Sequence, residues 1–304
     1  MFTARNKGRL ALGAVAVGAA LALSGCASGD PLDSGDQDPG ADSSVIVVGS
    51  QAYYSNEIIA EIYAQALENA GFEVEREFRI GQRDAYLPSL EDGSVDLFPE
   101  YTGNLLQFYD PDTEATASED VYAALQEALP DGLTVLDQSP ATDQDSYNVT
   151  EAFAAEHGLS SLEDLASVGV PLVLGGPPEL EARPYGPTGL AEKYGVDVAF
   201  QATGDTTVED LLAGTVNIAN VYSADPRIQT EGLVTLDDPK GLFLASNIVP
   251  LVNAAIADEI ADVINAVSAK LTPEGLVDLN VRSTVDQEST AAIATAWLTE
   301  QGLI

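Results

Sequence analysis

The stretch "LEDGSVDLFPEYT" (90–102) returns later in the chain in altered form as "LLAGTVNIANVYS" (211–223). In each copy a tyrosine, Tyr101 or Tyr222, follows a glycine by eight residues and ends a short apolar run typical of a buried strand. Ligands of open α/β sheets bind outside the carboxyl ends of the strands. The repeat therefore predicts two tyrosines that face a ligand, or else two ordinary helix-to-strand transitions whose tyrosines lie on the surface.

The segments around both copies alternate between strand and helix patterns. Strand-like runs occur in two series, each interrupted by segments with apolar residues at helical spacing, and the runs are "VIVVGS" (45–50), "FEVEREF" (72–78), "VDLFP" (95–99), "VPLVLGG" (170–176), "VDVAFQA" (196–202) and "VNIANVY" (216–222). Two successive series of this kind predict an α/β fold with two sheets and crossover helices.

The last third of the chain is different. "IVPLVNA" (248–254) predicts one more strand, and helices follow it. Thr272 and Pro273 have the pattern of a helix cap and first helical residue. The apolar stripe of the preceding helix is Ile256, Ile260, Val263, Ile264 and Val267.

The composition excludes one class of partner. The chain has 304 residues, 45% of them hydrophobic, so it can bury a large core despite a formal charge of -37. Only 12 Lys and Arg residues are present. Because phosphate contacts need these side chains, nucleic acid is not expected as a partner, and the acidic excess is expected to form a solvated coat.

The N-terminus predicts export and lipidation. A basic segment precedes the apolar run 10–23, which is shorter than a bilayer span and typical of a signal peptide, here residues 1–25. The run ends in "LSGC", which resembles a bacterial lipobox, so Cys26 is expected to carry the lipid. Residues 26–44 are polar and form the expected flexible tether, so the folded part begins near Val45.

Catalysis has little support in the sequence. The chain has one histidine, His157, and one cysteine, Cys26, which excludes Cys/His dyads, histidine-based triads and the usual zinc ligand sets. No carboxylate pair stands out, and "LGGPPEL" (174–180) lacks the features of a phosphate-binding loop. A binding protein without catalytic residues, metal or cofactor is therefore expected.

A family resemblance runs in order over nearly all of residues 45–304. Its most specific segments are "PEYTG" (99–103), "ARPYGPTGLAEKYGV" (182–196) and "VNIANVYSADPRI" (216–228). They resemble the glycine betaine, choline and related osmoprotectant-binding proteins of ABC importers. The resemblance implies an extracytoplasmic receptor, held on the cell membrane by its lipid, that delivers a quaternary-ammonium solute to an ABC permease and its ATPase.

The resemblance also implies the architecture. It is that of a two-lobed periplasmic-binding protein of the type II-like class, with the ligand cleft between the lobes. Lobe 1 would combine residues 45–140 with 247–304, and lobe 2 would comprise residues 141–246.

A quaternary ammonium ion donates no hydrogen bond, so aromatic ring faces must hold it. In the family, tyrosines from both lobes form such a cage, and the matching positions are Tyr101, Tyr147 and Tyr222. Asp145 matches an acidic residue that borders the cage.

A ligand carboxylate needs a cationic donor, for which Arg183 is the matching residue. An alternative role for Arg183 is a structural salt bridge to Glu179 or Glu181.

Two departures from the family pattern leave the ligand open. Gln51 stands where relatives often carry a lysine, and Ser246 with Asn247 stands where some have a further tyrosine. Tyr53 or Tyr54 could complete the cage. Glycine betaine, choline, carnitine, proline betaine and ergothioneine all remain candidates. Two rival functions are a surface interaction lipoprotein without a small-molecule ligand and a hydrolase that uses neither His nor Cys.

Overall fold

The computed structural model describes residues 45–304. The expected signal peptide (1–25) and the expected lipidated tether (26–44), with Cys26, lie outside the described residues. Within 45–304, no helix has both the length and the apolar composition that crossing a membrane would require.

The first of two sheets has five strands in the order β2-β1-β3-β10-β4. Strand β1 pairs in parallel with β2 and β3, whereas β10 runs antiparallel to both of its neighbours, β3 and β4. The strands are β1 (Ile46–Gln51), β2 (Val74–Gly81), β3 (Leu97–Tyr101), β4 (Leu133–Val135) and β10 (Ile248–Asn253). We call this sheet and the helices packed on it lobe 1.

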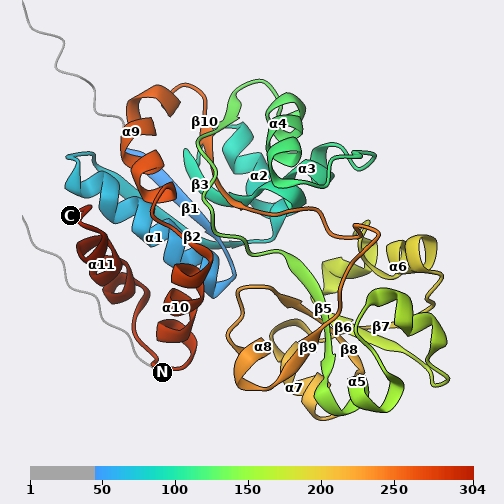
Figure 1. Ribbon diagram of the computed structural model, residues 1–304. Helices are drawn as coiled ribbons and strands as arrows, with labels where there is room; N and C mark the ends of the chain where they lie inside the picture. The colour runs from blue at the N-terminus through green and yellow to red at the C-terminus, as the bar shows by residue number, and fades with distance from the viewer. Residues whose placement is uncertain (1–44) are drawn as a thin grey trace, which may run out of the picture. The chain divides into compact units, whose positions relative to one another are not determined.

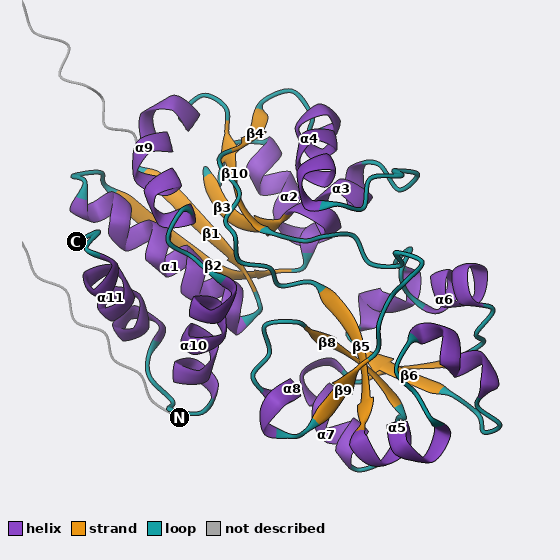
Figure 2. Cartoon of the chain, in the orientation of Figure 1, coloured by secondary structure: helices purple, strands orange, loops and turns teal. Residues whose placement is uncertain are grey.

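Helices cover both faces of this sheet, as Figure 2 shows. Strand β3 illustrates why, since its side chains alternate between two apolar clusters: Leu97 belongs to one and Phe98 to the other. A strand buried on both faces reads as a continuous apolar run, which is how the sequence appears here. The helices are α1 (Tyr54–Asn69), α2 (Arg83–Glu91), α3 (Thr102–Tyr109), α4 (Ser118–Ala128), α9 (Ala257–Ser268), α10 (Pro273–Thr284) and α11 (Thr290–Gln301).

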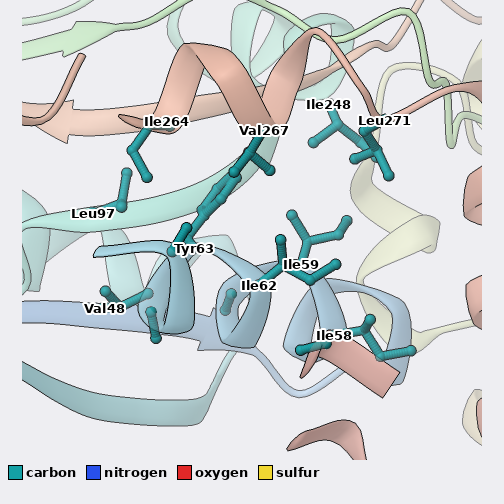
Figure 3. Close-up of a cluster of buried hydrophobic side chains, with 14 of the residues drawn as sticks. Val48, Ile58, Ile59, Ile62, Tyr63, Leu97, Ile248, Ile264, Val267 and Leu271 are labelled. Atoms are coloured by element: carbon teal, nitrogen blue, oxygen red, sulfur yellow. The ribbon is translucent and has the colours of Figure 1, made fainter. Parts of the chain in front are cut away.

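The larger cluster joins the two ends of the folded chain. Helices α1 and α11 pack together on the same side of the sheet as α9 and α10 (Figure 1). In the close-up of Figure 3, Ile59, Ile62 and Tyr63 of α1 face Ile264 and Val267 of α9. The apolar stripe expected in the C-terminal helices therefore packs on the first helix of the lobe.

The predicted helix start at Thr272 is confirmed. The Thr272 hydroxyl accepts a hydrogen bond from the Gly275 backbone N–H at 3.1 Å, and Pro273 is the first residue of α10. The cap satisfies a donor that the helix itself leaves unpaired.

The second sheet also has five strands, in the order β7-β6-β8-β5-β9, and we call it with its helices lobe 2. Its strands are β5 (Asp145–Thr150), β6 (Val173–Gly176), β7 (Ala199–Ala202), β8 (Ile218–Tyr222) and β9 (Leu233–Thr235). Its helices are α5 (Glu151–His157), α6 (Pro187–Tyr194), α7 (Thr207–Leu212) and α8 (Arg227–Thr230), with short 3₁₀ helices at Leu162–Ser167, Pro178–Ala182 and Gly204–Thr206. The α/β fold with two sheets is thus confirmed.

The chain passes between the two sheets twice, and the two passages lie side by side. Thr142 and Asn247 form an antiparallel bridge, and the Asp143 backbone N–H donates to the Ser246 carbonyl at 3.2 Å. The two passages therefore form a paired connection at the place where the sheets approach each other.

Candidate ligand-binding site

A small cavity lies where residues of the two sheets meet. Its volume is about 30 Å³, room for about two water molecules. We call it the inner cavity. Lobe 1 contributes Gln51, Tyr53, Gln82, Arg83, Tyr101 and Asn104, while the passage and lobe 2 contribute Asp143, Asp145, Pro177, Glu179, Leu180, Arg183, Tyr185 and Tyr222.

Four tyrosines line the inner cavity. Tyr53 immediately precedes α1, and its ring centroid lies 5.0 Å from that of Tyr222, with the rings tilted by 47°. Tyr101 is the last residue of β3, and its hydroxyl accepts a hydrogen bond from the Asn56 amide at 3.3 Å. Tyr222 is the last residue of β8. The repeated motif therefore brings one strand-end tyrosine from each sheet to the same cavity.

The tyrosine hydroxyls remain protonated. Burial, with the nearby carboxylates as the second cause, raises the pKa of Tyr53, Tyr101 and Tyr222 well above the usual value of a tyrosine. These side chains therefore present neutral rings, whose faces attract a cation through the ring quadrupole.

Tyr147 does not line the cavity, in contrast to the expectation from the sequence. It is fully buried in the lobe 2 core, where its ring meets Phe243 edge-on at 5.0 Å. The cause is its position on β5: Asp145 begins this strand at the cavity, and Tyr147 lies two residues, about 7 Å, further into the lobe.

Tyr185 lines the cavity instead, and the sequence reasoning missed it. Its carbonyl oxygen accepts the hydrogen bond of the Tyr147 hydroxyl at 2.5 Å, so Tyr147 holds the segment that carries Tyr185. The signal was available, because Tyr185 stands two residues after Arg183 in the segment "ARPYGPTG".

Two glycines shape the turn that carries Tyr185. A Cβ atom on Gly186 would lie 2.1 Å from the Leu180 carbonyl oxygen, and one on Gly189 would lie 2.0 Å from that of Pro184. Only glycine permits so close an approach of backbone to backbone. The glycine spacing in "RPYGPTG" is thus explained by packing.

Two buried carboxylates face the cavity. Asp145 is 4% exposed and accepts hydrogen bonds from the side-chain amides of Asn104 (2.7 Å) and Asn220 (3.0 Å). Asp143 is 3% exposed and accepts from the Tyr53 hydroxyl and the Ala224 backbone N–H, both at 3.1 Å. Among residues 45–304, neither carboxylate has a Lys, Arg or His within salt-bridge distance.

Burial controls the ionisation of both groups. It raises the pKa of Asp145, and it raises the pKa of Asp143 to about 7. A buried carboxylate without a cationic partner is costly when ionised. The cavity is therefore an acidic, partly dehydrated site that a positively charged group would stabilise.

Arg83, which the sequence reasoning also missed, lines the cavity but forms its ion pair with a different carboxylate. Its guanidinium forms two bonds with the fully buried Glu100, at 2.7 and 2.9 Å. The Tyr86 hydroxyl and the Tyr101 backbone N–H also donate to the Glu100 carboxylate. No spacing in the sequence pairs Arg83 with Glu100, since their meeting depends on how α2 packs beside β3.

Arg183 lines the cavity from the end of the 3₁₀ helix Pro178–Ala182 and is half-buried. Within the described part of the chain it forms no ion pair, so the alternative salt bridge to Glu179 or Glu181 is not present. Its guanidinium remains available for an anionic group.

Comparison with known proteins identifies the family of this chain. A family described as the substrate-binding domain of the ABC-type glycine betaine transport system matches residues 44–300. The chain belongs to this family. As a member of the glycine betaine transport family, it is expected to have relatives of the same fold among solved structures.

Several solved structures share the fold of this family. A glycine betaine/carnitine/choline ABC transporter protein is 18% identical, with a TM-score of 0.70, covering 85% of this chain and 99% of that one. Apo YehZ from Escherichia coli is 24% identical, with a TM-score of 0.63 and coverage of 86% and 100%. Lactococcal OpuAC, closed on glycine betaine, is 14% identical, with a TM-score of 0.61 and coverage of 84% and 96%.

The positions that depart from the glycine betaine family pattern have structural roles here. Ser246 donates to the Asn104 side-chain carbonyl at 2.7 Å and so orients Asn104, which bridges to Asp145 and to the Tyr185 hydroxyl. Gln51 lines the cavity and donates to the Tyr86 hydroxyl at 3.2 Å.

The remaining candidates, Tyr53, Tyr54 and Asn247, occupy three different places. Of the two tyrosines before and at the start of α1, Tyr53 lines the inner cavity, whereas Tyr54 lines a larger cleft outside it. Asn247 lies in the paired passages, where its amide donates to the Ser139 carbonyl at 2.9 Å. Among residues 45–304, no group of three His, Cys, Asp or Glu could hold a metal ion.

Proposed function

We propose that this protein is an extracytoplasmic receptor that binds a small quaternary-ammonium solute between its lobes and delivers it to an ABC permease. One observation carries the proposal: tyrosine rings of both lobes line a cavity that also holds two buried carboxylates without a cationic partner. The protein performs no chemistry on the solute.

The physical basis is the chemistry of the trimethylammonium group. Each ring face contributes about 0.5 to 2 kcal/mol to the binding of such a cation, depending on how far it is desolvated. Tyr53, Tyr101, Tyr185 and Tyr222 form the proposed cage, in place of the cage with Tyr147. Asp143 and Asp145 supply the negative charge, and Arg183 is the proposed partner of a ligand carboxylate.

Ligand binding is coupled to the closure of the lobes in this proposal. Tyr53 belongs to lobe 1 and Tyr222 to lobe 2, and a cation between them contacts both. Because the inner cavity has room for only about two waters, the rings must part to admit the solute and close again around it. The closed receptor is then the form that the permease recognises.

Export and anchoring belong to the same proposal. Cleavage after residue 25 and lipidation of Cys26 would place the domain on the outer side of the cell membrane, joined by the tether 26–44. The proposed lobe boundaries lie at 140/141 and 246/247, beside the paired passages.

Isothermal titration calorimetry on the chain with Cys26→Ser tests the ligand class. The panel comprises glycine betaine, choline, carnitine, proline betaine and ergothioneine. We expect a dissociation constant in the micromolar range, about -8 kcal/mol, for at least one of them.

Two variants at one position separate the ring from the hydroxyl. Tyr222→Phe keeps the ring and is expected to keep most of the affinity, whereas Tyr222→Leu removes the ring and is expected to weaken binding about tenfold or more. No binding across the panel would favour the rival function of a surface interaction lipoprotein without a small-molecule ligand.

A further inference from the structure

A loop of lobe 2 is buried against lobe 1. Residues Ser223–Asp225 directly follow Tyr222, the last residue of β8, and we call them the β8 loop. Ala224 of this loop is 2% exposed and belongs to the larger apolar cluster of lobe 1, together with residues of α1, α9 and α10. Lobe 2 therefore contacts the core of lobe 1 at a place outside the two chain passages.

The β8 loop runs beside the first passage. The Ser223 backbone N–H donates to the Gln144 carbonyl at 2.9 Å, and the Ala224 backbone N–H donates to the Asp143 carboxylate at 3.1 Å. The backbone N–H of Asp143 in turn donates to Ser246 of the second passage. Three chain segments thus lie side by side where the lobes meet, and the β8 loop, unlike the two passages, does not lead into lobe 1.

One side chain of lobe 1 holds the β8 loop. Asn280, in α10, is fully buried, and its Nδ2 donates to the Ala224 carbonyl at 2.9 Å. The opposite orientation of the amide would set two acceptors, the side-chain oxygen of Asn280 and the carbonyl oxygen of Ala224, against each other. This hydrogen bond therefore joins a helix of lobe 1 to the residue two positions after Tyr222 of the proposed cage.

Core packing does not account for Asn280. Leu276 and Leu279 of the same helix belong to the apolar cluster that contains Ala224, and a leucine at position 280 would extend that cluster without desolvating an amide. Asn280 Oδ1 also has no hydrogen-bond partner among residues 45–304. A buried polar group that core packing does not favour is typical of a functional contact. The contact that Asn280 makes is the one to lobe 2.

The place of this contact determines its effect on the motion of the lobes. Two adjacent passages alone allow the lobes to twist as well as to open. A third attachment beside them limits the lobes to one motion, the opening and closing of the cleft. Because the β8 loop lies next to the passages, it is close to the axis of that motion, and its contact with Asn280 can persist while the cleft opens.

We propose that Asn280 is a positioning residue: through the Ala224 carbonyl it makes the β8 loop a third, non-covalent connection between the lobes, which returns Tyr222 to the same place against lobe 1 at each closure. The connection is present without solute. Its loss widens the range of ligand-free conformations and lowers the fraction of receptor whose cage is aligned, so every solute binds more weakly by the same factor. The part of this inference that concerns affinity rests on the proposed function.

Distances between spin labels test the connection without any solute. The labels are attached to Asp84→Cys in lobe 1 and Glu181→Cys in lobe 2, in the chain with Cys26→Ser. Both residues are exposed, and each directly follows a residue that lines the inner cavity. We expect Asn280→Leu, which removes the donor, to broaden the ligand-free distance distribution about twofold or more. Asn280→Ala serves where the leucine variant does not fold.

A second buried asparagine provides the matched control. Asn148 on β5 is also fully buried, and its side chain forms hydrogen bonds with Ser146 and Thr235 within lobe 2. Asn148→Leu should lower the stability, as Asn280→Leu does, and leave the distance distribution unchanged. An unchanged distribution in Asn280→Leu, or equal broadening in both variants, would overturn the third connection.

Hydrogen exchange on the unaltered receptor needs no variant. Without solute, we expect the backbone N–H groups of Ser223 and Ala224 to exchange as slowly as that of Asp143 in the first passage, because the connection keeps the β8 loop buried. Rapid exchange in the β8 loop beside a protected passage would show that the connection is absent from the ligand-free receptor and would overturn the inference.

Calorimetry with the panel of the proposed function completes the test. Asn280→Leu should weaken each compound that binds by one common factor, about tenfold. Unequal factors would show that Asn280 acts on one group of the ligand and would overturn its role in lobe motion. Failure of every compound to bind the unaltered receptor would overturn the proposed function, whereas the distance and exchange measurements would still decide whether the third connection exists.

Discussion

The Tyr53 hydroxyl donates a hydrogen bond to the Asp143 carboxylate at 3.1 Å, although 90 residues separate the two in the chain. Tyr53 precedes the first helix of lobe 1, and Asp143 lies in the first passage to lobe 2. This contact connects a ring that we propose holds the cation to a buried carboxylate. Burial raises the pKa of this carboxylate to about 7. Under the proposed function, ligand affinity, lobe closure and the protonation of Asp143 are therefore linked at one position.

The affinity for a quaternary ammonium solute is expected to depend on pH through Asp143. A cation favours the ionised carboxylate, whose pKa in the unliganded protein is about 7. Affinity should therefore fall about tenfold between pH 8 and pH 6, as the carboxylate takes up a proton. Calorimetry at both values measures this change. Asp143→Asn should bind more weakly with a flat profile over this range, and an equally steep profile in that variant would contradict the assignment.

Asp143 is also expected to lower the stability of the unliganded protein at high pH. Its folded pKa lies above its ordinary value of 3.8, so the protonated form contributes stability that is present below about pH 4 and lost as the pH rises through about 7. The cost at pH 8 is on the order of 4 kcal/mol. The melting temperature of Asp143→Asn, relative to that of the unaltered protein, should therefore increase between pH 4 and pH 8. The exposed Asp137→Asn is the control and should show no such trend.

Loss of the Glu100 carboxylate is expected to destabilise lobe 1. Glu100→Gln leaves the buried Arg83 guanidinium without its counter-charge, which costs about 3 to 5 kcal/mol of unfolding free energy. Urea denaturation measures the loss. Glu68→Gln removes a partner of Arg76 in a more exposed pair, and its cost should stay below about 1 kcal/mol. Equal losses of unfolding free energy in the two variants would show that burial does not determine how much an ion pair stabilises this protein.

Addition of a methyl group at Gly189 is expected to displace the turn that carries Tyr185. The Cβ atom would lie 2.0 Å from the Pro184 carbonyl oxygen, so backbone has to move. Gly189→Ala should lower the unfolding free energy by more than about 2 kcal/mol and weaken ligand binding. Gly169→Ala, where a Cβ atom would meet nothing within 4 Å, is the matched control and should change neither quantity.

Replacement of Cys26 tests the proposed anchor. Cys26→Ser should move the protein from the membrane fraction to the aqueous fraction, because the acyl chains would have no attachment site. Immunoblotting of the two fractions measures this, with Ser28→Ala as the control for a small change beside the lipobox. Retention of the serine variant in the membrane fraction would refute the anchor.

Much of the fold could be predicted from local patterns. The apolar runs of β1, β3, β6 and β10 are buried on both faces, so the sequence alone marks them as strands. Strand β5 was not predicted, because the apolar pattern of "DSYNVT" is interrupted by Asp145, Ser146 and Asn148, whose side chains are buried by hydrogen bonding. Helices α3 and α4 carry no strong cap in the sequence, and neither has a side-chain cap in the structure.

The cavity could be predicted only in part. Tyr101 and Tyr222 end strands that point at the cleft, and the repeated spacing identifies them. Tyr147 lies two residues inside β5, whereas Tyr185 lies in the turn before α6, and spacing along one segment does not reveal which of the two reaches the cavity. Asn220 lies inside the repeated segment, yet its hydrogen bond to Asp145 depends on the pairing of β8 with β5, which the sequence does not reveal.

Strand β10 lies between β3 and β4 although it follows every strand of lobe 2 in the chain. As the polypeptide emerges from the ribosome or the export channel, lobe 1 is incomplete until residue 253 has appeared, since β4 has no partner in the sheet before then. All five strands of lobe 2 lie within residues 145–235, so this lobe can assemble while the sheet of lobe 1 is still open. A chain that ends between residues 244 and 248 would thus contain the core residues of lobe 2, up to Phe243, but would lack β10, and the receptor would have no complete cage.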